Sequence, residues 1–105
     1  MEGMELISFE IISNVGGAKS CYMEAMQDAK KGDIEGAREK IDEGDKLFVH
    51  GHHAHYKLVQ EEASGSPVNA SLLLIHAEDQ MMSTETLKLV ALEFIDLYEK
   101  QYANA

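Results

Sequence analysis

The chain has few residues of the kinds that cross-link small domains or interrupt regular secondary structure. Among its 105 residues there are one cysteine, one proline and no tryptophan. A single cysteine excludes a disulfide framework within the chain and fits a reducing, cytosolic setting. With so few breaking residues, the sequence allows long uninterrupted helices.

Basic charge and long apolar runs are also scarce. Nine basic side chains stand against nineteen acidic ones, which gives a formal net charge of −10. This balance argues against nucleic acids and anionic membrane surfaces, because both bind proteins through lysine and arginine. No apolar run is longer than four residues, whereas a membrane span needs about 20. The acidic N-terminus also differs from the basic start of a signal peptide. We therefore expect one small cytoplasmic domain over residues 1–105.

Two breaks divide the chain into three stretches rich in good helix formers. The first break is Lys31–Asp33, where Gly32 can end one helix and Asp33 can cap the next; the second runs from Ala63 to Pro67. No stretch alternates strictly between polar and apolar residues, as a half-buried strand does. The sequence thus predicts an all-α protein, an antiparallel three-helix bundle. The predicted helices span residues 4–31, 33–62 and 69–102, the last capped by Asn69 or Ser71.

The predicted helices are long for the size of the chain. A helix of about 30 residues runs about 45 Å, so three of them form a thin bundle with a modest core. Apolar surface that such a bundle leaves uncovered favours assembly into an oligomer.

The third predicted helix carries polar residues within its apolar arc. On a helical wheel its solvated side gathers Glu78, Glu85, Lys88, Glu93, Asp96, Glu99 and Lys100. The opposite, apolar side gathers Leu87, Val90, Ala91, Phe94, Leu97 and Tyr98. Four polar residues fall within that apolar arc, namely His76, Asp79, Gln80 and Ser83.

His76, Asp79 and Gln80 form the candidate site. They are three and four residues apart, so they are neighbours on one helix surface. A carboxylate on a buried face is costly unless it is paired or bound to a cation. The pattern alone leaves a plainer interpretation open, in which His76 is a satisfied core residue and Asp79 favours the helix dipole.

Several segments of the chain resemble a known family. His-Ala-Glu-Asp-Gln-Met-Met, from His76 to Met82, is similar to the active-site segment of enzyme IIA from the lactose/cellobiose (N,N′-diacetylchitobiose) type of bacterial phosphotransferase system. Residues 11–20, 25–37 and 58–63 resemble the family's first helix, its first turn and the end of its second helix. The sequence departs from the family pattern at His55-Tyr56, where a Gln-Thr pair is usual.

The resemblance implies a function and an assembly. His76 would accept a phosphoryl group from the phosphocarrier protein HPr and pass it to a cysteine of the IIB component. The group would then reach a β-linked disaccharide, such as lactose, cellobiose or diacetylchitobiose, that enters through the membrane component IIC. The family also implies a homotrimer of nine helices in which three Asp79 side chains surround one divalent cation. Mg²⁺ fits such oxygen ligands best.

The chemistry of the segment agrees with phosphoryl transfer. Neutral imidazole is a competent nucleophile near neutral pH, because its free lone pair needs no separate base. Gln80 lies one turn beyond His76, where its amide can donate a hydrogen bond to a phosphoryl oxygen.

The residue pattern leaves two other functions open. One is a non-catalytic helical oligomer or metal-binding scaffold in which His76 is buried and Asp79 is structural. The other is a signalling histidine-phosphotransfer domain, although its usual His-x-Leu-Lys-Gly context is absent. Elsewhere, the cluster His50, His52, His53 and His55 has spacings that suit either a transition metal or a solvated helix face. Cys21 is expected to be a small core residue.

Overall fold

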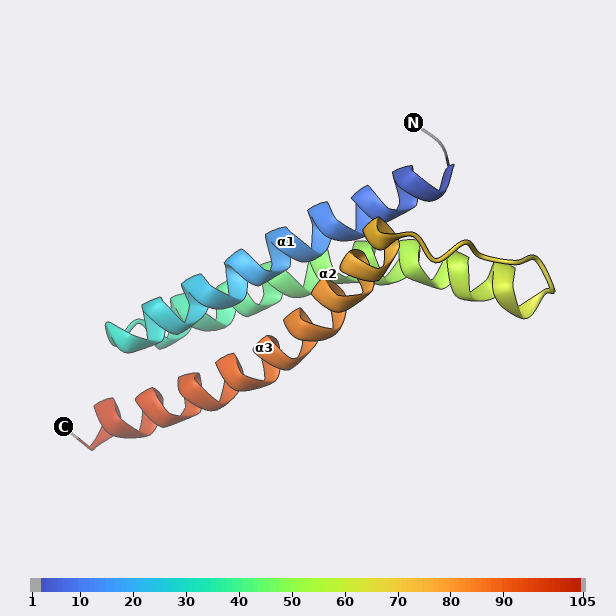
Figure 1. The fold of residues 1–105 in the computed structure, drawn as a ribbon. Helices are drawn as coiled ribbons and strands as arrows, with labels where there is room; N and C mark the ends of the chain where they lie inside the picture. The colour runs from blue at the N-terminus through green and yellow to red at the C-terminus, as the bar shows by residue number, and fades with distance from the viewer. Residues whose placement is uncertain (1–2, 105) are drawn as a thin grey trace.

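The computed structural model describes residues 3–104, which form three α-helices (Figure 1). Helix α1 spans Gly3–Lys30, α2 spans Ile34–Ala63 and α3 spans Leu72–Ala103. Within residues 3–104 there is no β-strand, so the all-α three-helix prediction is confirmed. The Cα atoms extend over 57 × 23 × 20 Å, which is the elongated shape expected of long helices in a short chain.

The turn between α1 and α2 follows the predicted capping residues. Gly32 adopts a positive φ of 92°, a conformation that glycine reaches without the steric cost of a Cβ atom. Asp33 then caps α2, because its carboxylate accepts a hydrogen bond of 2.9 Å from the backbone N–H of Gly36.

The start of α3 differs from the prediction. The helix begins at Leu72, three residues later than expected, and Ser71 rather than Asn69 is its cap. The hydroxyl of Ser71 accepts a hydrogen bond of 3.1 Å from the backbone N–H of Leu74. The backbone carbonyl of Asn69 instead accepts from the N–H of Ser71, so Asn69 belongs to the connector between α2 and α3.

Helix α1 lies against both other helices, whereas α2 and α3 contact each other much less. Two clusters of buried side chains result, and each draws on all three helices. The first contains Ala18, Tyr22, Ala25, Ala29, Ala37, Ile41, Ala91 and Ile95. The second contains Ile11, Val15, Ala54, Leu58, Leu74, Ala77 and Met81.

A polar network at mid-length joins the three helices. The Tyr22 side chain is fully buried, and its hydroxyl donates a hydrogen bond of 2.7 Å to Asp45 on α2. Lys88 on α3 lies 3.0 Å from the same carboxylate. Burial, followed by the hydrogen bond to Asp45 and its charge, raises the pKa of Tyr22 well above its ordinary value.

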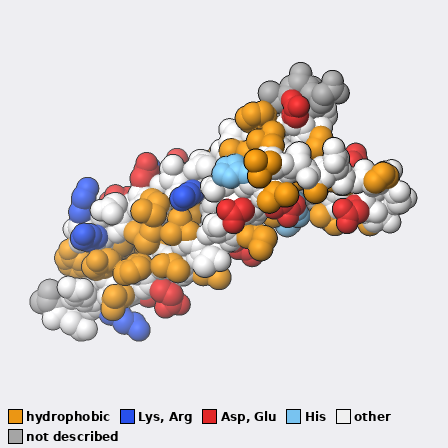
Figure 2. Space-filling view, viewed as in Figure 1, with side chains coloured by type: hydrophobic (Ala, Val, Ile, Leu, Met, Phe, Trp, Pro, Cys, Tyr) orange, Lys and Arg blue, Asp and Glu red, His pale blue; other side chains and the backbone are white. Residues whose placement is uncertain are grey.

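The apolar side of α3 found on the helical wheel packs within the chain only in part. The buried residues of α3 are Leu74, Ala77, Met81, Thr84, Ala91 and Ile95. Of the apolar side found on the wheel, Ala91 is buried and Leu87 and Tyr98 pack partly buried against the core. Val90, Phe94 and Leu97 of the same side are exposed. In Figure 2 apolar side chains gather over α3 on the visible face. The helical wheel does not separate the buried part from the exposed part, because α3 is apolar on two sides and the position of α1 decides which of them is covered.

Two residues on the polar side of α3 also differ from the prediction. Glu78 and Lys88, predicted to be solvated, are half-buried. Glu78 forms a hydrogen bond with His55, and Lys88 forms an ion pair with Asp45. Separately, none of the helices within residues 3–104 has the length and apolar character required to cross a membrane.

Candidate functional site

His76 lies in the second turn of α3, close to the cap at Ser71, and its side chain is exposed. The nearby Leu72 and Ile75 are also exposed, with 82 % of the residue surface accessible at Leu72. An imidazole beside exposed apolar side chains is open to a docking protein. The interpretation of His76 as a buried core histidine is therefore wrong for the protomer.

Asp79 and Gln80 follow His76 by one turn of the same helix. Asp79 is exposed and Gln80 is half-buried. His76 and Asp79 thus lie on the side of the helix that points away from the packed side, and Gln80 lies at its edge. Chemically, the face offers one nucleophilic ring, one amide donor and one carboxylate, all of them within reach of a molecule that approaches from outside the protomer.

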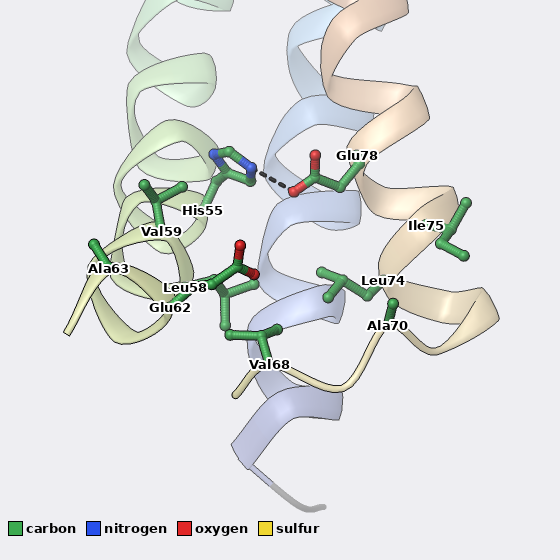
Figure 3. Close-up of a pocket in the computed structure, with 10 residues that line it drawn as sticks. All are labelled: His55, Leu58, Val59, Glu62, Ala63, Val68, Ala70, Leu74, Ile75 and Glu78. Carbon is green, nitrogen blue, oxygen red and sulfur yellow. Dashed lines mark hydrogen bonds and ion pairs between the residues drawn. The ribbon is translucent and has the colours of Figure 1, made fainter. Parts of the chain in front are cut away.

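Glu78 points to the other side of α3, toward α2. It forms a hydrogen-bonded pair with the Nε2 atom of His55, as Figure 3 shows. The pair borders a cavity of about 680 Å³ between the end of α2, the connector and the start of α3. No sequence pattern predicts this contact, because the two residues are 23 positions apart and belong to different helices.

The remaining histidines of α2 do not converge on one point. His50 and His53 border a hollow between α1 and α2 together with Glu10. His52 borders a second cavity, of about 420 Å³, beside Tyr22 and Lys88. Within residues 3–104, no group of three or more histidine, cysteine, aspartate or glutamate side chains is arranged to hold a metal ion.

Cys21 is half-buried on α1. Burial raises the pKa of its thiol, and the nearby carboxylates of Glu43 and Glu24 raise it further. Because the thiolate is the reactive form of cysteine, this environment disfavours nucleophilic chemistry at Cys21.

Comparison of the sequence with known proteins identifies the family to which the chain is similar. Residues 6–99 match the family described as the lactose/cellobiose-specific IIA subunit of the phosphotransferase system. The lichenan-specific phosphotransferase enzyme IIA component of Bacillus subtilis is 42 % identical over 99 residues, which cover 94 % of this chain and 90 % of that protein.

Solved structures agree with the sequence comparison. The cellobiose-specific enzyme IIA from Bacillus anthracis is 42 % identical, with a TM-score of 0.96 over 100 % of this chain and 96 % of that one. The IIA(Chitobiose) in complex with HPr, from the N,N′-diacetylchitobiose branch of the Escherichia coli phosphotransferase system, is 28 % identical. Its TM-score is 0.83 over 97 % of this chain and 99 % of that one.

Proposed function

The chain belongs to the lactose/cellobiose-specific IIA family of the phosphotransferase system, and we propose that His76 is the residue on which it carries the phosphoryl group. Proteins of this family are phosphotransferase components that carry a phosphoryl group. The observation that carries the assignment is the exposure of His76 within the His-Ala-Glu-Asp-Gln segment. It presents a nucleophilic ring on a face that the protomer leaves free.

The proposed donor is phospho-HPr, and a related IIA has been solved in complex with HPr. The His76 ring attacks the phosphorus atom with its free lone pair, so a new N–P bond forms while the N–P bond of the donor breaks. One proton passes from the ring that gains the group to the ring that loses it, by way of solvent, which keeps the charges balanced. The exposed apolar side chains of Leu72 and Ile75 exclude water from the contact once the donor has docked.

Gln80 is the proposed hydrogen-bond donor to the phosphoryl group. It is half-buried and lies one helical turn after His76, so its amide N–H can reach an oxygen of a group bound to the ring. Phosphoryl transfer depends mainly on positioning and on stabilising the charge of those oxygens. The proposed acceptor is the cysteine of a IIB component.

The wider setting follows from the same proposal. The phosphoryl group leaves the IIB component for a β-linked disaccharide, of the lactose, cellobiose or diacetylchitobiose kind, as it enters through the membrane component IIC. We propose that the protein works in the cytoplasm, where the exchange with HPr would take place; its single cysteine supports a reducing setting.

We also propose a homotrimer with a divalent cation, Mg²⁺, held by Asp79. One exposed carboxylate cannot hold a metal by itself, but a threefold axis brings three copies together. The exposed Val90 and Leu97 lie near the line of Asp79 along α3, so the same face supplies apolar contacts between copies. The oxygen donors fit Mg²⁺, which would offset the repulsion of three carboxylates.

A labelling experiment tests the role of His76. The protein is incubated with HPr and the kinase that phosphorylates it, and the modified residue is located by mass spectrometry. We expect His76→Ala to abolish labelling, because no other side chain replaces the imidazole. His53→Ala is the matched control, because His53 is an exposed histidine on α2. We expect this variant to be labelled at the wild-type rate. Labelling of His76→Ala at an undiminished rate would contradict the proposal.

A further inference from the structure

Helices α2 and α3 are joined by polar links at three levels along the bundle. They pack on α1 rather than on each other, and cavities of about 680 and 420 Å³ open on the side where they face each other. The links that cross between them are Arg38 with Asp96 and Glu99, Asp45 with Lys88, and His55 with Glu78.

The His55–Glu78 pair is the link nearest to His76. The His55 side chain is only 18 % exposed, and it borders the larger cavity with Leu58 and Leu74 (Figure 3). Among the described residues, no other side-chain hydrogen bond connects α2 to the first two turns of α3. The cavity leaves those turns with little packing from α2 on that side, so the pair ties them to α2.

The direction of Glu78 determines the direction of His76. The two residues are two positions apart, which corresponds to about 200° around a helix. They therefore point to nearly opposite sides of α3. Because a helix is stiff about its own axis, holding Glu78 against His55 turns His76 away from α2 and toward the outside.

We propose that His55 is a positioning residue for phosphoryl transfer, which acts through Glu78 to hold the first turns of α3 so that His76 faces an incoming donor. The proposal rests on the function proposed above. His55 itself touches neither donor nor phosphoryl group, so it governs the rate of the transfer step rather than the docking of the donor.

The test measures single-turnover transfer from phospho-HPr over a range of HPr concentrations. His55→Leu removes the link, His55→Gln keeps a donor for Glu78, and His53→Leu is the control on the same helix. We expect His55→Leu to lower the maximal transfer rate by about three- to tenfold, because the net contribution of one hydrogen bond corresponds to about that factor. The HPr concentration at half-maximal rate should change by less than about twofold, and His55→Gln and His53→Leu should stay within about twofold of wild type.

Glu78→Ala keeps the test decisive if His55→Leu fails to fold, and a double variant tests whether both changes remove the same interaction. Glu78→Ala cuts the same link from α3 and should lower the maximal rate as His55→Leu does. The double variant His55→Leu/Glu78→Ala should fall no further than either single variant, because both remove one interaction. Additive losses in the double variant would overturn the proposal.

The ring resonances of His76, followed by NMR, supply a readout that global stability does not move. We expect them to shift in His55→Leu and to stay at the wild-type position in His55→Gln. A folded His55→Leu protein with an unchanged transfer rate and unchanged His76 resonances would overturn the positioning role alone. Absence of label on His76 in the wild-type protein would instead overturn the proposed function.

Discussion

Tyr22 shows how a single side chain links packing to charge. Its ring is fully buried against α2, at a point where α2 carries Gly44. A Cβ atom at Gly44 would lie 2.6 Å from Cε1 of the tyrosine ring. Beyond this contact the hydroxyl donates to Asp45, which forms a half-exposed ion pair with Lys88. The buried ring is thus connected to a charged pair near the surface.

Because the pKa of Tyr22 is raised in the folded protein, the free energy of unfolding changes with pH in the alkaline range. In the folded state the hydroxyl keeps its proton above pH 10, whereas an unfolded tyrosine loses it near that value. The stabilisation is fully present below about pH 10 and is lost as the pH rises beyond it. We expect Tyr22→Phe to show a smaller loss of unfolding free energy between about pH 9 and 11 than wild type does, measured by urea denaturation. Tyr56→Phe, at an exposed tyrosine, is the control, and equal slopes for all three proteins would contradict the expectation.

Helix packing predicts opposite outcomes for two glycine substitutions. Gly44→Ala places a methyl group against the buried ring of Tyr22, and overpacking of this kind costs about 1–3 kcal/mol. Gly16→Ala, on α1, meets nothing within 4 Å and should stabilise by about 0.5–1 kcal/mol, because alanine favours the helix. Thermal unfolding followed by circular dichroism at one protein concentration compares the two. A Gly44→Ala protein at least as stable as Gly16→Ala would show that α1 and α2 do not approach closely there.

The helices themselves could be predicted from the sequence, because the signals are local. Asp33 and Ser71 cap the helices that follow them, and both lie within three residues of the N–H groups that they satisfy. The side on which α3 packs could not be predicted, since it depends on where α1 lies. The His76 segment was found through its resemblance to a family, whereas the partner of His55 becomes visible only when α2 and α3 are placed together.

At the scale of the whole molecule, the protomer leaves an apolar face of α3 uncovered. Val90, Phe94 and Leu97 are exposed there, with 57 % of the surface accessible at Leu97. Any contact that covers this face is stabilised by about 25 cal/mol for each Å² of apolar surface that it buries. His76 and Asp79 lie on the exposed side of the same helix. Assembly through α3 would therefore bring the Asp79 side chains of different subunits toward one another and leave His76 beside the interface between subunits.

The charge on Asp79 predicts how the proposed trimer would respond to a divalent cation. Three carboxylates around one axis repel each other unless a cation or protons intervene, so a chelator should weaken the wild-type trimer and Mg²⁺ should restore it. Asp79→Asn and Asp79→Leu remove that repulsion, so we expect both to keep or raise the stability of the trimer in metal-free buffer. Each 1.4 kcal/mol of repulsion removed would lower the dissociation constant of the trimer about tenfold. Sedimentation equilibrium with and without chelator measures this, with Asp96→Asn as a control at an acidic residue that pairs with Arg38 instead. If both Asp79 variants assembled much more weakly than wild type without metal, Asp79 would hold the trimer by direct contacts rather than through a cation.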